Sequence, residues 1–360
     1  MHISKFFRTF AAKTIRTMKK VLLFFVALTC YLSCFAWTSP VAIPDVGDAR
    51  LHVVGWNVQN YLTDFTASNS SCASEAEFVT KTNKMANAFL ALQADIVAIC
   101  EVQANDEVLG FIADAMNTIY GQAVYTFVTD GLYEGQSEDG YQPIKSGFIY
   151  RNDKLALQGT STSPYYNGNT YELRLRIQAF KEISSGEVFI LSLNHFKAKS
   201  GSGDQGESTR LKNVSQLLKK LNTITYDPDI LLVGDMNAYV GEAPIVALEE
   251  AGYTDLLVKY GGPDVYSYIY YGVPGLLDHA MANESMETQV TGAALYHLNT
   301  AGGWSYKFSD HDGYVVGLNL GNSQAIESPQ NENAARKIIR NGVFYIEIDG
   351  HLFDVLGNRR

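Results

Sequence analysis

Short apolar runs alternate along the chain with segments in which apolar residues recur at helical spacing. Between residues 75 and 93 the apolar positions from Phe78 to Leu92 repeat with a period near 3.6, which predicts an amphipathic helix. Helices are also expected at 106–119 and 211–221. Strands are expected at 51–58, 95–101, 145–151, 172–183, 188–195, 230–237, 275–282, 289–297 and 313–320. No Pro-rich or low-complexity linker interrupts this alternation before about residue 320, so it indicates a single domain.

Four of these strands end in side chains that bind metal ions or phosphate. They are Asn57, Glu101, His195 and the pair Asp235 and Asn237. A strand packed in a core holds its last side chains in fixed positions, which is what a catalytic constellation requires. For any one of these residues alone, a solvated strand end or a turn former is the better explanation. Five chemically compatible ends in one domain favour a functional site.

The N-terminal segment has the pattern of an export signal. Lys19 and Lys20 precede an apolar run from Val21 to Trp37, and cleavage is expected near Ala36. The alternative is a retained membrane anchor, but the run is shorter than the roughly 20 residues that a spanning helix needs. Residues 1–36 are therefore interpreted as a secretory signal peptide of a bacterial protein that is secreted, periplasmic or bound at the cell surface.

The remaining chain divides into three parts. Residues 37–320 form the expected catalytic domain, residues 321–333 a polar linker, and residues 334–360 a C-terminal tail. Two extended runs around Asp349 and Gly350 predict a β-hairpin in this tail.

Cys72 and Cys100 are the cysteines that follow the expected signal peptide. An oxidising compartment permits a disulfide between them, although nothing in their spacing demands one. Cys100 ends an apolar run and is expected to be a small buried hydrophobic residue.

The net charge restricts how the protein can bind an anionic partner. Residues 1–36 contain six Lys and Arg and no Asp or Glu, so 22 basic residues face 38 acidic ones in the rest, a balance of −16. This excludes nucleic-acid binding through bulk positive charge. A local basic groove, or a cation bound among carboxylates, would reverse the sign locally.

The candidate residues have the chemistry of phosphodiester hydrolysis. Oxygen ligands from Asp, Glu and Asn suit Mg²⁺, with Mn²⁺ or Ca²⁺ as alternatives, and the Cys and His spacings of a zinc site are absent. Asp278 and His311 are the candidate pair in which a carboxylate orients an imidazole for acid–base catalysis. The GxSxG and P-loop patterns do not occur in the sequence, which argues against serine hydrolysis and P-loop nucleotide binding.

In their order and approximate spacing, these residues resemble the endonuclease/exonuclease/phosphatase superfamily, the deoxyribonuclease I-like fold, over about residues 50–320. The segments NHFKAKSG (194–201), GDMNAYVGEAPI (234–245) and YSYIYYGVPGLLDHAMAN (266–283) are similar to those of secreted bacterial extracellular nucleases. The resemblance implies an α/β fold, a four-layer α-β-β-α sandwich of two mixed sheets with outer helices and the active site at one edge.

The resemblance also implies a role for each candidate residue. Asn57, Glu101 and Asp310 would surround the divalent cation. Asp235, helped by Asn237, would orient or deprotonate the attacking water. His195 would bind the scissile phosphate, and His311, aligned by Asp278, would stabilise the pentavalent phosphate or assist the leaving oxygen.

Contacts to the substrate backbone need local positive charge. Arg151, Lys197 and Lys199 are the candidates, and the two lysines follow His195 in a Gly/Ser-rich segment. Tyr266, Tyr268, Tyr270 and Tyr271 have two interpretations, stacking on bases or packing of a strand in the core or on the surface.

Three functions follow from this sequence. The leading hypothesis is a secreted, cation-dependent endonuclease with little sequence preference, acting on DNA and alternatively on RNA, as a monomer without a stable membrane partner. The second is a sphingomyelinase-like or inositol-phosphate phosphoesterase of the same fold, which needs an exposed apolar hairpin that the sequence does not assign. The third is a non-catalytic binding module, against which the complete set of candidate residues argues.

Overall fold

The computed structural model describes residues 37–135, 139–165, 169 and 171–321, together with the backbone of three strands between residues 336 and 353. The signal peptide expected at residues 1–36 lies outside the described residues, and so does the linker expected at residues 321–333 apart from Gly321. The chain divides into one unit that ends at Gly321 and a second that begins at Asn322.

The first sheet has six strands in the order β13-β14-β1-β2-β4-β3. β1 pairs in parallel with β2 and antiparallel with β14, so the sheet is mixed. Its strands are β1 (Leu51–Tyr61), β2 (Ile96–Gln103), β3 (Tyr125–Phe127), β4 (Ile144–Arg151), β13 (Val290–Tyr296) and β14 (Gly313–Leu318).

The second sheet also has six strands, in the order β5-β6-β7-β8-β12-β9. β7 and β8 are parallel, whereas β12 runs antiparallel to β8. Its strands are β5 (Leu155–Thr162), β6 (Leu175–Glu182), β7 (Val188–Asn194), β8 (Ile230–Asp235), β9 (Tyr253–Asp255) and β12 (Asp278–Asn283).

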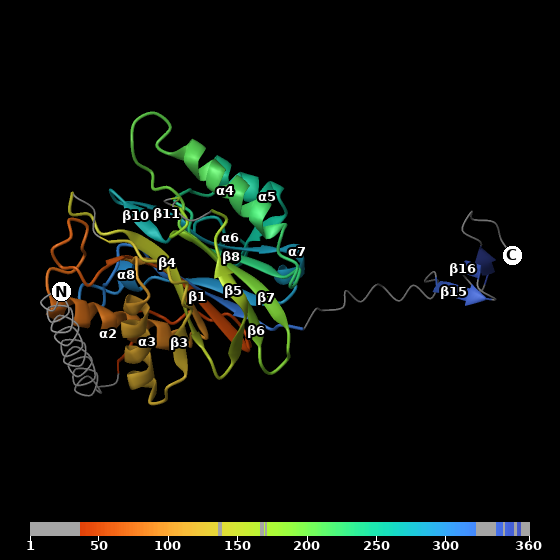
Figure 1. Ribbon diagram of the computed structural model, residues 1–360, viewed down its shortest axis with the longest axis horizontal. Coiled ribbons are helices and arrows are strands. Elements are labelled where there is room, and N and C mark those ends of the chain that lie inside the picture. The colour runs from red at the N-terminus through yellow and green to blue at the C-terminus, as the bar shows by residue number, and fades with distance from the viewer. Residues whose placement is uncertain are drawn as a thin grey trace, which may run out of the picture. The chain divides into compact units, whose positions relative to one another are not determined.

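Helices cover the outer face of each sheet (Figure 1). α2 (Glu75–Ala91) and α3 (Glu107–Tyr120) lie on the first sheet, and α4 (Glu207–Leu221) and α5 (Ala243–Glu250) on the second. The short helices α6 (Leu256–Gly261), α7 (Glu284–Glu287) and α8 (Leu298–Ala301) lie in the connections. Within the described part of the chain, no helix combines the length and hydrophobicity that a bilayer-spanning helix needs.

Three apolar layers hold the sandwich together. One, which includes Leu191 and Val316, fills the space between the sheets. Another packs α2 and α3 against the first sheet around Trp56, and a third packs α4 and α5 against the second sheet around Leu232. Successive residues of a strand face opposite sides of the sheet. A strand that is covered on both faces is therefore a continuous apolar run in the sequence. The predicted four-layer sandwich of two mixed sheets with outer helices is confirmed.

Two smaller sheets complete the described structure. β10 (Tyr268–Tyr270) and β11 (Val273–Gly275) form an antiparallel hairpin. In the second unit, β15 (Arg336–Arg340), β16 (Val343–Ile348) and β17 (His351–Phe353) form an antiparallel three-stranded sheet. The expected hairpin around residues 349–350 corresponds to the pairing of β16 with β17, and β15 adds a third strand.

The strand directions bring the candidate residues to one edge of the sandwich. β1 and β2 are parallel, and so are β7 and β8, so their C-terminal ends point the same way within each sheet. β12 is antiparallel to β8 and begins at this edge, where Asp278 pairs with Asp235. In contrast, Arg151 ends β4, which runs antiparallel to β2, so it lies at the opposite edge.

Candidate active site

Asn57 joins the two sheets at this edge. Its buried side-chain amide donates one hydrogen bond to Glu101 Oε1 at 2.9 Å and another to Asp235 Oδ2 at 3.0 Å. Glu101 belongs to β2 of the first sheet and Asp235 to β8 of the second. Two carboxylate oxygens from different sheets therefore converge on one amide.

Glu101 enters the site through an unusual backbone conformation. Its φ of 65° lies in the left-handed region, at the irregularity where the pairing of β2 with β1 and β4 shifts register. This conformation costs a non-glycine residue about 1–3 kcal/mol and concentrates at functional sites. Glu101 Oε2 accepts a hydrogen bond from the Asn60 backbone at 3.0 Å, which fixes the carboxylate.

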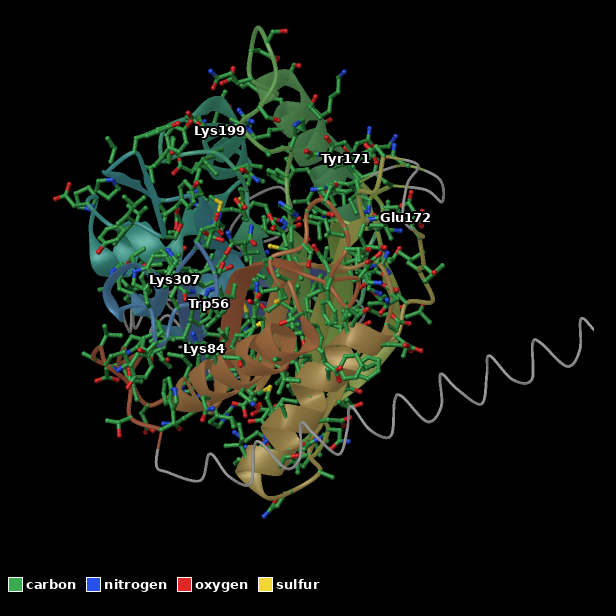
Figure 2. All side chains as sticks on the ribbon, turned by 90° about the vertical axis from the view of Figure 1, so that its left-hand side faces the viewer. Trp56, Lys84, Tyr171, Glu172, Lys199 and Lys307 are labelled. Carbon is green, nitrogen blue, oxygen red and sulfur yellow. The ribbon has the colours of Figure 1, made fainter. Side chains whose placement is uncertain are left out.

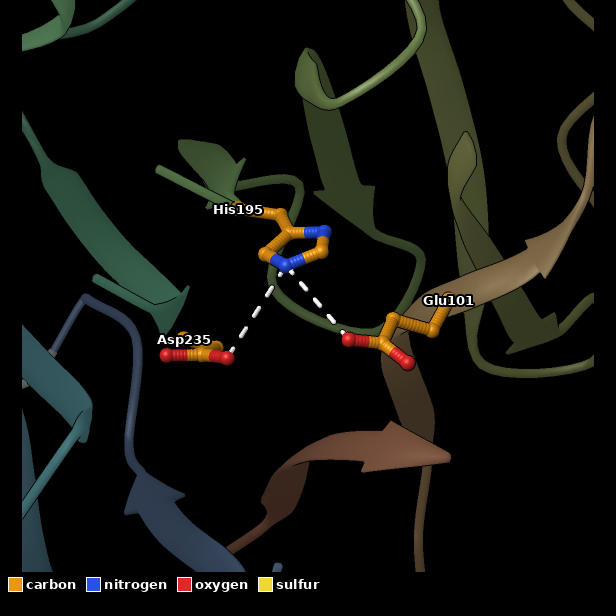
Figure 3. Close-up of side chains that lie close together, drawn as sticks. All are labelled: Glu101, His195 and Asp235. Carbon is orange, nitrogen blue, oxygen red and sulfur yellow. Dashed lines mark ion pairs between the residues drawn. The ribbon is translucent and has the colours of Figure 1, made fainter. Parts of the chain in front are cut away.

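His195 faces the same two carboxylates (Figure 3). Its Nε2 lies 3.6 Å from Glu101 Oε1 and 3.9 Å from Asp235 Oδ2. Burial, followed by the charges of Arg174 and His311, holds the pKa of His195 well below its usual value. His195 is therefore a neutral imidazole, and its buried Nδ1 has no hydrogen-bond partner among the described residues.

His311 and Asp278 form a buried dyad that also faces Asp235. His311 Nδ1 donates to Asp278 Oδ2 at 2.6 Å, and His311 Nε2 lies 3.9 Å from Asp235 Oδ2. Burial lowers the pKa of His311, but the carboxylates, Asp278 first, outweigh it and raise the pKa well above its usual value. His311 is therefore held as an imidazolium at neutral pH.

Asp235 Oδ2 is approached by both histidines, each with its Nε2 at 3.9 Å. Burial raises its pKa to about 7, His311 opposes this shift and Asp278 adds to it. Its Oδ1 accepts a hydrogen bond from the Asn237 backbone at 2.9 Å. The Asn237 side chain donates to the Phe196 carbonyl at 3.2 Å, so its amide nitrogen ties the strand ends of β7 and β8 together.

Asp310 is partly exposed at the rim of this cluster. The neighbouring Ser309 hydroxyl donates to the Asn57 carbonyl at 2.6 Å, which fixes the segment beside Asn57. Because Asn57 also donates a hydrogen bond to Glu101, the segment that carries Asp310 is linked to the acidic cluster. Two groups of acidic and imidazole ligands converge within the described part of the chain, Glu101–His195–Asp235 and Asp235–Asp278–His311, and Asp310 belongs to neither.

The donor set fits a divalent cation. Potential ligand atoms of Glu101, His195 and Asp235 lie within 4.8 Å of one another. The Asn57 amide bridges the carboxylates of Glu101 and Asp235, and a bound cation would offset the repulsion that remains between their charges. Their hard oxygen atoms, with that of the Asn57 side chain, are the donors that Mg²⁺, Mn²⁺ and Ca²⁺ prefer.

Lys81 is a buried residue of the site that the sequence interpretation missed. Its ammonium donates to the Gln59 carbonyl and to Ser71 Oγ, both at 2.7 Å. Burial lowers its pKa to about 8, although Cys72, Glu101 and Asp310 act in the opposite direction. The sequence carried a sign of this burial, because Lys81 lies three residues after Phe78 and therefore on the apolar face of α2. Its ammonium holds the loop after β1 beside the acidic cluster.

The three expected substrate contacts have different surroundings. Arg151 pairs with Asp153 at 2.6 Å at the far edge, so the structure does not bring it to the site. Lys197 donates to Ser200 Oγ at 2.6 Å close to the site. Lys199 pairs with Glu242 and lies over the Tyr239 ring, which leaves little net charge for a phosphate. In Figure 2, Lys199 lies in the upper part of the molecule.

Comparison with known proteins identifies the family. The sequence profile of the Endonuclease/Exonuclease/phosphatase family matches residues 54–311. The chain belongs to this family. Members of the family hydrolyse phosphoester bonds and typically depend on a divalent metal ion, in agreement with the carboxylate cluster described above. No curated protein matches the chain significantly in sequence.

Solved structures of this family share the fold. An endonuclease/exonuclease/phosphatase from Bacteroides vulgatus matches with a TM-score of 0.54 and 14% identity, over 75% of this chain and 98% of the other. A mannosyl-6-phosphatase of Bacteroides thetaiotaomicron matches with a TM-score of 0.54 and 16% identity, over 75% and 100%. The human Nocturnin catalytic domain matches with a TM-score of 0.53 and 18% identity, over 75% and 94%. At these identities the likeness shows the fold alone.

Proposed function

We propose that this protein is a secreted, divalent-cation-dependent phosphodiesterase that hydrolyses nucleic acid, with DNA as the first substrate to test. The observation that carries the proposal is the position of Asp235, whose Oδ2 lies 3.9 Å from Nε2 of the neutral His195 and 3.9 Å from Nε2 of His311 in the His311–Asp278 dyad. The similarity of three segments of the sequence to secreted bacterial nucleases supports nucleic acid over other phosphodiesters. Export rests on the N-terminal pattern of residues 1–36.

Asp235, His311 and His195 have different protonation states, which give each a different role in the reaction. Asp235, with a pKa of about 7, accepts a proton from water as the water oxygen bonds to phosphorus. His311 is an imidazolium whose Nε2–H donates to the leaving oxygen as the P–O bond breaks. His195 is neutral, and its Nε2–H binds a non-bridging phosphate oxygen. Asp278 keeps the His311 ring aligned and charged.

Glu101 and Asn57, with Asp310 at the rim, would hold the cation. When bound, a divalent cation neutralises charge that develops on the phosphate. The backbone conformation of Glu101 and the hydrogen bonds of Asn57 keep these ligands in place. Because the charge balance beyond residue 36 is −16, such a cation is also what makes this edge attractive to a polyanion.

The test is incubation of purified protein with plasmid DNA, RNA and sphingomyelin, each with Mg²⁺, Mn²⁺ or Ca²⁺ and with a chelator. Cleavage of DNA or RNA that stops on chelation supports the proposal. An Asp235→Ala variant is expected to lose at least ~10²-fold in rate, as does His311→Ala, because each removes a general acid–base group. A rate near that of the unmodified protein in either variant refutes the assigned roles.

One observation favours a second candidate function. The β10–β11 hairpin exposes Ile269, Tyr270, Tyr271 and Val273 beside the site, which is the feature that a phosphoesterase acting on membrane lipids needs. Cleavage of sphingomyelin without cleavage of DNA or RNA would establish this lipid alternative. Absence of turnover on every substrate would favour a binding module.

A further inference from the structure

The β10–β11 hairpin carries a row of tyrosines that begins at the catalytic histidine. The Tyr268 ring lies on the His311 ring, with centroids 4.7 Å apart. Tyr270 follows on the same face of β10, nearly parallel to Tyr268 at a centroid distance of 6.4 Å and an angle of 22°. The Tyr271 ring contacts the Tyr270 ring, with centroids 4.6 Å apart. The row thus runs from the site to the protein surface.

The base of this hairpin is fixed to the site. Ser267 Oγ accepts the backbone N–H groups of Leu277 and Asp278, both at 3.1 Å, and the Ser267 carbonyl accepts the Asp312 N–H at 2.7 Å. On the other strand, Gly275 packs so closely on the Tyr239 ring that a Cβ there would lie 2.4 Å from it. The rings are therefore held in position relative to His311.

The tip of the hairpin is exposed and uncharged. Tyr270 is 56% exposed and Tyr271 is 90% exposed. The segment from Val265 to Leu277 contains no Asp, Glu, Lys or Arg. It cannot bind phosphate through charge, so what it offers a ligand is the faces of aromatic rings.

We propose that Tyr270 and Tyr271 form a stacking subsite for an unpaired nucleobase of the nucleotide next to the scissile phosphate. The proposal rests on the nuclease function proposed above. The row starts at the imidazole that faces the phosphate, so a base attached to the adjacent sugar lies within its reach. Stacking on aromatic rings tolerates every base, which suits an enzyme with little sequence preference. Single strands, or strands with splayed bases, are the preferred substrates.

The experiment compares two single strands with the same backbone charge, an oligothymidylate 15-mer and a 15-mer made of abasic sites. In the Tyr270→Ala/Tyr271→Ala variant, KM for oligothymidylate is expected to rise about fivefold or more, with kcat little changed and the abasic strand cleaved as by the unmodified protein. The Tyr270→Phe/Tyr271→Phe variant keeps the rings and should restore KM. Tyr226→Ala, at an exposed tyrosine before β8 at the far edge, is the matched control.

Salt dependence separates stacking from phosphate binding. The slope of log KM against log salt concentration should be the same in the alanine variant and the unmodified protein, since stacking releases no counterions. Equal losses on the two strands, or no loss on either, would overturn the stacking subsite while leaving the nuclease function in place. If the unmodified protein cleaves no nucleic acid, both proposals fall.

A membrane role for the hairpin is an outcome of the same series. Vesicles of phosphatidylcholine and sphingomyelin are sedimented with the unmodified protein and with the alanine variant. Binding that the variant loses, with an unchanged KM for oligothymidylate, would overturn the stacking subsite and assign the hairpin to a lipid surface. Absence of vesicle binding, together with a KM that depends on the bases of the strand, supports the stacking subsite.

Discussion

His311 Nδ1 lies 2.6 Å from Asp278 Oδ2, although the two residues are 33 positions apart in the sequence. Asp278 opens β12 of the second sheet, and His311 lies just before β14 of the first. The contact therefore spans the sandwich at the edge where the two sheets carry their polar strand ends. It leaves His311 Nε2 directed at Asp235, 3.9 Å away.

An Asp278→Asn substitution tests this dyad. The amide keeps the shape of the side chain but removes the charge that raises the pKa of His311, so the imidazolium is lost at a lower pH. We expect the rate at neutral pH to fall at least ~10²-fold and the alkaline limb of the pH–rate profile to move to lower pH. The measurement is kcat across pH, with a thermal melt of the variant as the control for folding. A profile that keeps its alkaline limb would show that His311 does not act as the acid.

A Glu101→Gln substitution tests the cation site without an activity assay. A cation that binds only the folded state stabilises it by about 2.7 kcal/mol at a concentration a hundredfold above its Kd. Mn²⁺ should therefore raise the Tm of the unmodified protein, and the rise should be lost or sharply reduced in the variant. Glu287→Gln is a suitable control, because Glu287 lies in α7, away from the cluster, and pairs with Lys259 of α6. An equal rise in all three proteins would locate the ion elsewhere.

A Lys145→Met substitution tests a buried charge network near the site. The Lys145 ammonium lies 2.6 Å from Asp106 Oδ1 and 2.8 Å from Asp130 Oδ1, and its side chain is fully buried. Its removal leaves the buried Asp130 carboxylate with the Arg176 guanidinium, 3.4 Å away, and the Leu132 backbone N–H, 2.9 Å away. We expect the free energy of unfolding to fall by about 3 kcal/mol, at the lower end of the range for breaking a buried pair.

Urea denaturation measures this loss against a control at an exposed pair. Lys259→Met removes the partner of Glu287 at the surface and should cost less than about 1 kcal/mol. Comparable losses in the two variants would mean that the Lys145 network contributes no more than a surface pair.

The sequence predicted the part of the site that depends on strand ends. Asn57, Glu101, His195 and Asp235 each follow an apolar run, and the parallel pairs β1–β2 and β7–β8 carry such ends to one edge. The pairing of Asp278 with His311 was expected on chemical grounds, and the structure places the two side chains in contact. Local pattern was sufficient for these residues because their positions follow from buried strands.

Residues outside that pattern required the tertiary structure. Arg151 was expected at the substrate, but the direction of β4 places it at the far edge. The direction of a strand cannot be predicted from a single apolar run. Of the two partners of Lys81, Ser71 belongs to a loop whose path no periodicity determines, and Gln59 lies at the irregular end of β1. The expected strand at 172–183 begins only at Leu175, since a turn joins the Tyr171 carbonyl to the Arg174 N–H. Cys72 and Cys100 are both buried and free.

An Asp255→Asn substitution tests a buried histidine that supports the catalytic loop. His279 Nδ1 lies 2.7 Å from Asp255 Oδ2, and its Nε2 lies 2.8 Å from the Ala238 carbonyl, between Asn237 and Tyr239. Both partners are acceptors, so both ring nitrogens must donate, and the ring is an imidazolium. Burial lowers the pKa of His279, but Asp255 and the Ala238 carbonyl outweigh it and raise the pKa above its usual value.

The raised pKa makes stability depend on pH in a defined direction. The folded state binds the His279 proton more tightly than the unfolded chain, whose histidine pKa is about 6.5. The stabilisation is complete below that pH and is lost as pH rises through the folded-state pKa. The amide introduced by Asp255→Asn would still cap α6 but would remove the negative charge that stabilises the His279 imidazolium. Urea denaturation from pH 6 upward measures the free energy of unfolding of the unmodified protein and of the variant. The difference between the two values should shrink as the pH rises. A difference that stays constant with pH would show that His279 is neutral in the folded protein.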